Sequence, residues 1–273
     1  MPKISSKPRV LITGASGLIG GLAIEHLSDK YQFSNLSRRK VEGIRSTEAS
    51  ITDRDAIRPA FEDIDMVLHL AAFVDDISDW DGTLDVTVKG TINVFRAAQE
   101  AGIWRLVNMS TGSTMCGWEW YEGSPYGKLA AGQYDEVEQP WPQLDHTNAV
   151  RPDSPYGAAK AFTEAAARWF SDAHGMSMLN IRLGAVLDTN EPKLLRHFPG
   201  YLDQMDAVRM IDACLSAPES VKFDIFDAIS DNSTRWRDTS HAEKVIGWKA
   251  QGSSDRFDPN DFRHQPGPPL PAR

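Results

Sequence analysis

The length, composition and charge of the chain exclude several classes of protein. Its 273 residues, 41% apolar and 25% charged, are enough to bury one large α/β core or a main domain with a small lobe. A formal net charge of −9 argues against nucleic acid or an anionic membrane as partner, and no apolar run reaches the roughly 18 residues of a membrane span. Cys116 and Cys214 form no CxxC pair, so we expect no disulfide framework, no zinc site and a cytoplasmic location.

Short apolar runs alternate with helical patterns along most of the chain. Strands are expected at 9–13, 31–37, 65–72, 105–111, 176–184 and 223–230. Helices are expected at 18–29, 53–63, 84–101, 154–175 and 203–218. This alternation predicts right-handed βαβ crossovers, and therefore an α/β fold with a doubly wound parallel sheet that carries helices on both faces.

Three stretches interrupt or follow this alternation. Residues 117–153 are rich in aromatic residues, Gly and Pro and lack periodicity, which predicts either a functional lid or a disordered insert. Residues 186–251 are expected to form a small C-terminal lobe. The Pro-rich residues 252–273 are expected to form an extended surface arm or a disordered tail.

The first expected strand is followed by Gly14, Gly17 and Gly20, which open the first expected helix. Here backbone N–H groups and the positive end of the helix can receive a pyrophosphate, and the third glycine lets the helix pack closely on the strand. The alternative is a plain turn between strand and helix. The dinucleotide interpretation assigns to the cofactor Gly14, Ser16, Gly17, Leu18, Ile19 and Gly20.

The end of the second expected strand lacks the carboxylate that would bind the ribose 2′-hydroxyl of NAD. It carries instead Asn35, Ser37, Arg38 and Arg39, whose neutral and basic side chains can accept a 2′-phosphate. The cofactor is therefore NAD or NADP, with a slight lean to NADP. The alternative is that the two arginines are only solvated.

Tyr156 and Lys160 stand four residues apart at the start of the expected helix 154–175. That spacing places both side chains on one helix face. An ammonium near a phenol stabilises the phenolate and should lower the pKa of the tyrosine toward neutrality. Such a tyrosine can take a proton from an alcohol as hydride leaves, or return it during reduction. No His, Asp or Glu cluster has the spacing of a metal site, so no metal is expected.

With these residues in view, the chain resembles an extended short-chain dehydrogenase/reductase of the NAD-dependent epimerase/dehydratase type. The motifs that carry the resemblance, in order over about residues 8–250, are "TGASGLIG", "DMVLHLAA", "VKGTINVFRAAQEAG", "MSTGS", "SPYGAAK" and "IRLGAV". The resemblance implies a Rossmann domain over 8–185 that includes the 117–153 insert. It also implies a bound nicotinamide dinucleotide and a substrate-binding lobe over 186–251.

Carried over position by position, the resemblance makes Tyr156 the acid/base and Lys160 a ligand of the nicotinamide ribose. Thr111 is the first choice for the residue that hydrogen-bonds the reacting oxygen, and Ser113 is the alternative. Further cofactor contacts implied by the resemblance are Leu70, Ala71, Ala72, Met109, Leu183 and Gly184. Phe73 and Ser113 are additional candidates for substrate contact.

The chain departs from the family pattern at two cofactor positions. Ser50, followed by Ile51, stands where the family usually has an aspartate that contacts adenine. Thr87 stands where the family tends to have asparagine. Both replacements keep a hydrogen-bonding group, so they put the affinity for the cofactor in doubt more than binding itself.

The short C-terminal region is similar to that of uronate dehydrogenases, a branch in which an arginine holds the sugar carboxylate. Arg196, with neighbours Lys193 and His197, is the nearest match, and a guanidinium can grip a carboxylate with two parallel hydrogen bonds. A plain surface arginine is the alternative. Against that branch, Gly112 and Ser113 replace its Asn-His pair.

Together these features predict an NAD(P)-dependent oxidoreductase that acts on a hydroxyl or carbonyl carbon of a sugar, a sugar acid or a related small molecule. A nucleotide-sugar epimerase or dehydratase is the enzymatic alternative. A non-catalytic dinucleotide-binding sensor or scaffold is the alternative of another class. The resemblance also implies a homodimer that pairs through the helices 84–101 and 154–171.

Overall fold

The computed structural model describes residues 7–121 and 123–263. Its centre is one sheet whose seven strands are all parallel, in the order β3-β2-β1-β4-β5-β6-β7. The strands are β1 (Arg9–Thr13), β2 (Gln32–Ser37), β3 (Arg45–Glu48), β4 (Met66–His69), β5 (Arg105–Thr111), β6 (Ser177–Leu183) and β7 (Phe223–Ala228). The expected α/β fold with a doubly wound parallel sheet is confirmed. Because the order reverses beside β1, ligands are expected at the carboxyl ends of β1 and β4.

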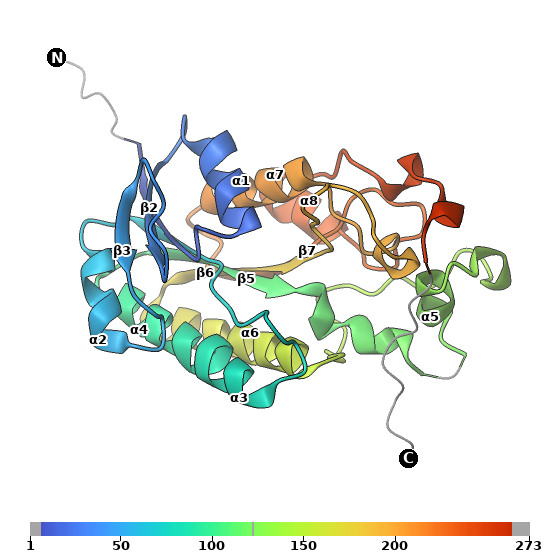
Figure 1. The fold of residues 1–273 in the computed structure, drawn as a ribbon, viewed down its shortest axis with the longest axis horizontal. Helices are drawn as coiled ribbons and strands as arrows, with labels where there is room; N and C mark the ends of the chain where they lie inside the picture. Colours follow the sequence, from blue (N-terminus) through green and yellow to red (C-terminus); the bar gives the residue numbers. More distant parts are fainter. Residues whose placement is uncertain (1–6, 122, 264–273) are drawn as a thin grey trace.

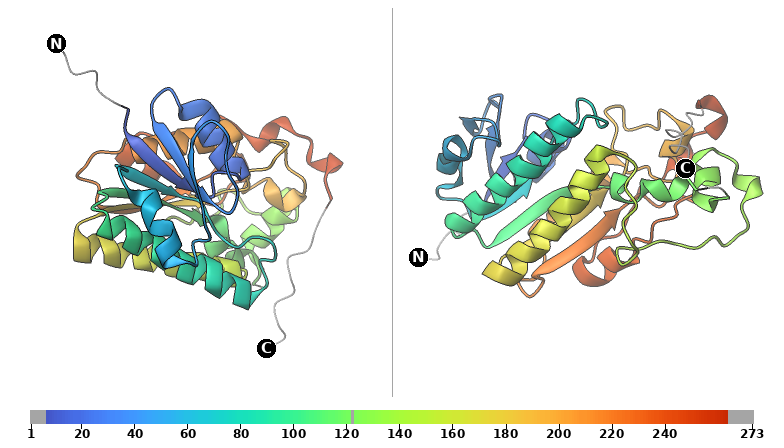
Figure 2. Two further views of the ribbon diagram at one scale, coloured as in Figure 1. Left: turned by 60° about the vertical axis from the view of Figure 1, so that its left-hand side comes forward. Right: turned by 90° about the horizontal axis from the view of Figure 1, so that it is seen from below.

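Helices cover both faces of the sheet (Figure 1). α1 (Leu18–Leu27), α7 (Gln204–Leu215) and α8 (Ser240–Ile246) share one apolar core with the sheet. α2 (Arg54–Ile57), α4 (Thr91–Glu100) and α6 (Pro155–His174) share the core of the opposite face. Figure 2 shows α4 and α6 side by side on that face. α4 continues the short α3 (Trp80–Gly82) through a π-helical segment, Thr83–Gly90.

Two parts of the sheet differ from the expected elements. The short strand β3 was not predicted, because its sequence RSTE is polar and no residue of it is fully buried. β7 and α7 fall within the region 186–251 that was expected to form a separate lobe. Yet β7 pairs with β6 along its whole length, and α7 packs beside α1. Both therefore extend the main sheet and its helical layer.

The insert 117–153 is folded around a small core of its own. It contains α5 (Pro125–Ala130), preceded by the 3₁₀ segment Cys116–Glu119. Leu129 is fully buried in a cluster with Tyr126, Leu144 and Trp236, the last of which comes from the C-terminal region. Figure 1 shows the insert and the C-terminal segment gathered at one end of the sheet. The described residues of the insert are therefore ordered, and the expected alternative of a disordered insert is wrong for them.

The first part of the expected C-terminal arm lies against the body of the protein. Ser254 is buried and its hydroxyl donates to the Phe198 carbonyl at 3.0 Å. The Leu195 amide donates to the Arg263 carbonyl at 3.1 Å. Residues 252–263 are therefore fixed to the segment after β6. The remainder of the expected tail, 264–273, lies outside the described residues.

Candidate active site

The glycine turn between β1 and α1 has the geometry of a phosphate site. Gly14 has φ +78°, and a Cβ there would lie 3.1 Å from the Ala71 backbone nitrogen. A Cβ on Gly20 would lie 2.6 Å from the Cα of Ala15, so the helix can approach the strand only with glycine there. Gly17 is the N-cap of α1 and has no side chain to occupy the first N–H groups of the helix. Those groups are free to receive a pyrophosphate, and the residues present fit the cofactor.

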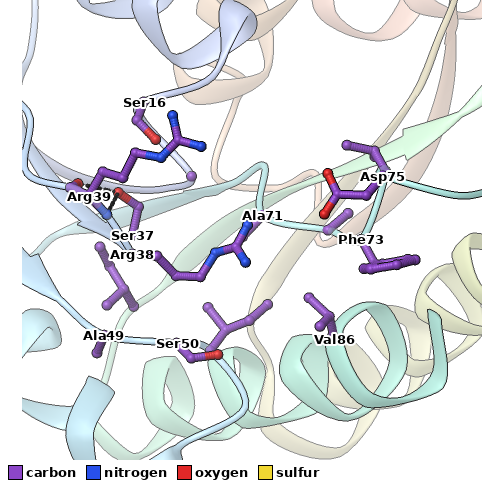
Figure 3. A pocket seen from close by; sticks show the side chains of 15 residues that line it. Ser16, Ser37, Arg38, Arg39, Ala49, Ser50, Ala71, Phe73, Asp75 and Val86 are labelled. Atoms are coloured by element: carbon purple, nitrogen blue, oxygen red, sulfur yellow. Dashed lines mark hydrogen bonds between the residues drawn. The ribbon is translucent and has the colours of Figure 1, made fainter. Parts of the chain in front are cut away.

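A pocket opens beside this turn, at the carboxyl ends of β1, β2 and β4 (Figure 3). In Figure 3 the Arg39 side chain extends toward Ser16, and Arg38 reaches toward Ala71. Both arginines are exposed, and within the described residues neither forms an ion pair with a carboxylate. The pocket is lined by Gly14, Ser16, Leu36, Ser37, Arg38, Arg39, Ala49, Ser50, Ile51, Ala71, Ala72, Phe73, Val74, Asp75 and Val86.

Several residues that the sequence assigned to the cofactor hold loops in place instead of lining this pocket. The buried Asn35 amide donates to the Arg39 carbonyl at 3.1 Å and to Ser46 Oγ at 3.2 Å. Thr87 is fully buried and its hydroxyl accepts the Phe73 N–H at 3.0 Å. These contacts fix the loop after β2 and the turn after β4, so Asn35 and Thr87 shape the pocket from behind.

The turn after β4 is held by a residue that the sequence analysis did not single out. The Thr13 hydroxyl accepts the N–H groups of Leu70 and Ala71, each at 3.2 Å. His69 contacts the same hydroxyl through Nδ1 at 2.7 Å and Thr91 through Nε2 at 2.9 Å. Burial lowers the pKa of His69 well below its ordinary value. His69 is therefore a neutral core residue that fixes the ends of β1 and β4.

Tyr156 and Lys160 lie one turn apart near the start of α6, which Ser154 caps by accepting the Gly157 N–H at 3.1 Å. The Lys160 ammonium is 5.8 Å from the centre of the Tyr156 ring and donates to the Met109 carbonyl at 2.7 Å. Burial lowers the pKa of Lys160 to about 8 and raises the pKa of Tyr156 to about 12. Burial is the cause of the raised tyrosine pKa, so the phenol is neutral in this structure, and the lowering of that pKa by the ammonium stays a prediction.

The carboxyl end of β5 meets the start of α6. The Thr111 hydroxyl accepts the Ser113 N–H at 3.2 Å, and the Ser113 carbonyl accepts the Asp153 N–H at 3.1 Å. A Cβ on Gly157 would lie only 2.5 Å from the Ser113 carbonyl oxygen. Both candidates for the third catalytic position, Thr111 and Ser113, therefore lie on a segment that packs directly against the turn carrying Tyr156.

A buried network of charged side chains connects β5, β6 and β7 with α6, next to the catalytic residues. Ser110, Arg182 and Asp227 are opposite one another on β5, β6 and β7. Glu164 of α6 accepts from the Ser110 hydroxyl at 2.5 Å and from Arg182 Nη2 at 2.8 Å. Glu164 stands one helical turn beyond Lys160, and its charge opposes the effect of burial on the lysine pKa. The network therefore supports a buried ammonium at Lys160.

The residues after β6 are placed by close backbone contacts. The Gly184 N–H donates to the Ala228 carbonyl at 2.9 Å. A Cβ on Gly184 would lie 2.5 Å from the Gly200 carbonyl oxygen. Leu183 is half-buried at the carboxyl end of β6, opposite Thr111. Only glycine fits at position 184, and its role in packing is independent of any ligand.

Arg196 is already paired with two carboxylates. Its Nη2 lies 3.2 Å from Glu119 Oε2 and 3.6 Å from Asp153 Oδ2. Burial raises the pKa of Glu119 to about 7, although Arg196 opposes this shift. The sequence analysis did not identify Glu119 and Asp153 as partners of Arg196. They precede Arg196 by 77 and 43 residues and lie inside a stretch without periodicity.

The chain matches the model of the NAD dependent epimerase/dehydratase family over residues 10–246. It belongs to this family. It is accordingly an NAD(P)-dependent enzyme, either a dehydrogenase/reductase or an epimerase, and the resemblance read from its motifs is confirmed.

Relatives of this family member include several dehydrogenases. L-arabinose 1-dehydrogenase (NAD(P)(+)) of Haloferax volcanii is 30% identical over 90% of this chain and 97% of its own length. Uronate dehydrogenase of Pseudomonas putida is 27% identical over 91% of this chain and 86% of its own. A solved variant of uronate dehydrogenase from Agrobacterium tumefaciens, complexed with NAD, has a TM-score of 0.79 at 22% identity, covering 98% of this chain and 92% of the other.

Two further observations concern metals and membranes. Across the described residues, His146, Asp224 and His241 bring ligand atoms within 4.8 Å of one another. The two imidazoles stack at 3.8 Å, and His241 Nε2 lies 2.7 Å from Asp224 Oδ1, so packing accounts for this group. These three residues are far apart in sequence, so no spacing motif indicated the group, and the absence of a bound metal stays a prediction. In the part of the chain that is described, no helix is long and apolar enough to cross a membrane.

Proposed function

We propose that this family member is a sugar dehydrogenase that uses Tyr156 as its acid/base. The observation that carries the proposal is the placement of Tyr156, with a buried Lys160 one turn away, against the end of β5. The names of the relatives support a sugar or sugar acid as substrate. The glycine turn and its pocket support a bound dinucleotide.

In the proposed oxidation a nicotinamide dinucleotide held at the glycine turn would supply the hydride acceptor for the substrate carbon. Tyr156, as phenolate, takes the proton of the hydroxyl, so that the C–O bond becomes a carbonyl. Burial alone raises the pKa of Tyr156 to about 12. Lys160, whose pKa is about 8, is mainly charged at pH 7, and its ammonium favours the phenolate against that effect of burial. Thr111 donates a hydrogen bond to the reacting oxygen. In the reverse direction the phenol of Tyr156 returns the proton.

NAD(P)H formation by the purified protein tests the proposal directly. A panel of neutral aldoses, hexuronates, nucleotide sugars and simple secondary alcohols is offered with NAD⁺ and with NADP⁺. Turnover on sugars that the Tyr156→Phe variant loses while it still binds cofactor supports the assignment. Tight cofactor binding without turnover on any member of the panel would contradict it and favour an epimerase or a sensor.

We also infer a preference for NADP over NAD. Arg38 and Arg39 lie at the pocket without carboxylate partners among the described residues, and Ser37 lies beside them. Guanidinium groups recognise phosphate through charge-assisted hydrogen bonds. The ratio of kcat/KM for NADP⁺ and NAD⁺ with one sugar tests this preference.

We further propose that the protein is a cytoplasmic homodimer. α6 exposes two large apolar side chains, with Phe162 47% and Trp169 59% accessible, and α4 lies beside it (Figure 2). Such a patch favours association with a second copy. Cys116 and Cys214 are both free thiols, as a reducing compartment allows. Light scattering of the wild type and of Phe162→Glu tests the dimer, because the charge would disrupt an interface on this patch.

A further inference from the structure

The side chains beside the catalytic segment form a charged cluster of which the sequence indicated only Arg196. Arg196, Glu119 and Asp153 lie together, and Asp153 directly precedes the Ser154 cap of α6. Asp153 is also joined to the catalytic segment through its N–H, which donates to the Ser113 carbonyl at 3.1 Å. The cluster therefore stands immediately beside the turn that carries Tyr156.

A second guanidinium lies on the other side of the same segment. Arg237 reaches so close to Gly112 that a Cβ there would lie 2.6 Å from its Nη1. Arg237 is only 4% exposed and pairs with the buried Asp227 at 3.2 Å. This second cation is therefore also neutralised, by a carboxylate that cannot reach solvent.

The neighbours of Arg196 supply no further positive charge. Lys193 pairs with Asp188 at 2.5 Å. Burial, together with Arg196, lowers the pKa of His197 to about 4, so the imidazole is neutral at pH 7. Glu119 and Asp153 thus face Arg196, and Asp227 pairs with Arg237 and lies opposite Arg182 in the sheet. Glu119 and Asp153 are only 7% exposed, whereas a quarter of the Arg196 side chain is exposed.

We propose that the substrate is an uncharged sugar, and that Glu119 and Asp153 set this preference by occupying Arg196. This inference rests on the proposed function and names the substrate class for the same site. An incoming substrate carboxylate would have to displace an existing partner of Arg196 and would then lie beside two like charges. A neutral sugar avoids this cost, and its hydroxyl groups can donate to Asp153 and to the ionised form of Glu119.

Three sugars that differ only in the substituent on C5 test the inference. L-Arabinose, D-galactose and D-galacturonate share the configuration at C2, C3 and C4, and carry hydrogen, hydroxymethyl and carboxylate on C5. We expect kcat/KM for L-arabinose or D-galactose to exceed that for D-galacturonate by roughly tenfold or more. In Glu119→Gln/Asp153→Asn, Arg196 loses both carboxylate partners. We expect the ratio of kcat/KM for the neutral sugar to kcat/KM for galacturonate to fall by roughly tenfold, through a lower KM for galacturonate.

The matched control removes two exposed carboxylates that also pair with cations. Glu243→Gln/Asp172→Asn changes the net charge equally, through Lys249 and Arg168 partners that lie outside the cluster, and should leave the ratio unchanged. A melting curve shows whether the double variant folds. If it does not, the Glu119→Gln single variant takes its place, and it should move the ratio in the same direction.

Two results would overturn the inference. A wild-type preference for galacturonate that Arg196→Met selectively abolishes would show that Arg196 binds the substrate carboxylate. An unchanged ratio in folded Glu119→Gln/Asp153→Asn would show that these carboxylates do not set specificity. Turnover on no sugar at all would instead contradict the proposed function itself, and the inference with it.

Discussion

The two ends of the active site are built in different ways. The cofactor end consists of backbone N–H groups, glycines and short side chains after β1 and β4, with Arg38, Arg39 and Asp75 as its charged residues. The substrate end consists of buried charges from the insert, from the start of α6 and from segments after β6 and β7. A site made from one short turn leaves a motif in the sequence, whereas a site made from scattered side chains leaves none. The first end therefore indicates the cofactor class, and the second must be read from the structure.

Removing the proton-transfer group is expected to have the largest effect. Tyr156→Phe should lower kcat by about 10²–10⁴-fold, because general acid–base catalysis contributes on that order. Affinity for the cofactor, measured by fluorescence titration, should change little because the glycine turn is untouched. A variant with near wild-type kcat would remove Tyr156 from the mechanism and would favour Thr111 or Ser113 as the group that carries the proton.

A methyl group on the glycine turn should damage the cofactor end. In Gly20→Ala the new Cβ would meet the Ala15 backbone at 2.6 Å, and overpacking of this kind costs about 1–3 kcal/mol of stability. Thermal unfolding with and without cofactor measures the loss. Gly21→Ala is the matched control, because nothing lies within 4 Å of that Cβ and the change should stabilise the helix by about 0.5–1 kcal/mol. Equal melting temperatures for both variants would contradict the close packing.

Loss of the two guanidinium groups at the pocket should shift the choice of cofactor. Arg38→Ala/Arg39→Ala should reduce the kcat/KM ratio of NADP⁺ to NAD⁺ by at least about tenfold, since even one charge-assisted hydrogen bond to phosphate is worth about 1.5–3 kcal/mol. Arg168→Ala removes an exposed guanidinium that pairs with Asp172 on α6, and it should leave the ratio unchanged. A constant ratio in the double variant would mean that the arginines are only solvated.

The smallest expected effect is a change of substrate preference with pH. Burial raises the pKa of Glu119 to about 7, in surroundings that also contain Arg196, Asp153, Arg237 and Cys116. Below that pH the carboxyl is protonated and releases part of the charge of Arg196, so the relative activity on galacturonate should rise as pH falls through 7. In Glu119→Gln this rise should disappear. Initial rates for L-arabinose and galacturonate between pH 6 and 8 provide the test, and parallel profiles in the wild type would contradict it.

The sequence was sufficient for the sheet, most helices, the glycine turn and the identity of the family. Local patterns carry those features, because strand and helix periodicity and a strand–turn–helix motif are confined to short segments. It missed β3, whose sequence is polar, and the assignment of β7 to the main sheet, because pairing with β6 is a tertiary event. The low pKa expected for Tyr156 stays a prediction, because the burial that raises this pKa in the structure cannot be read from one helix.

The contacts of the insert also determine when the substrate end can form during synthesis. The Leu144 N–H donates to the Trp236 carbonyl at 2.8 Å, and the Leu144 carbonyl accepts the Asp238 N–H at 2.8 Å. Tyr126 of α5 packs on Trp236 with ring centres 4.9 Å apart. A growing chain emerges from its N-terminus, so β1, α1 and β2 leave the ribosome long before Trp236 does. We expect the insert to stay unfolded until the segment around Trp236 has been synthesised. Until then its tryptophans and tyrosines are exposed to solvent and need protection from aggregation.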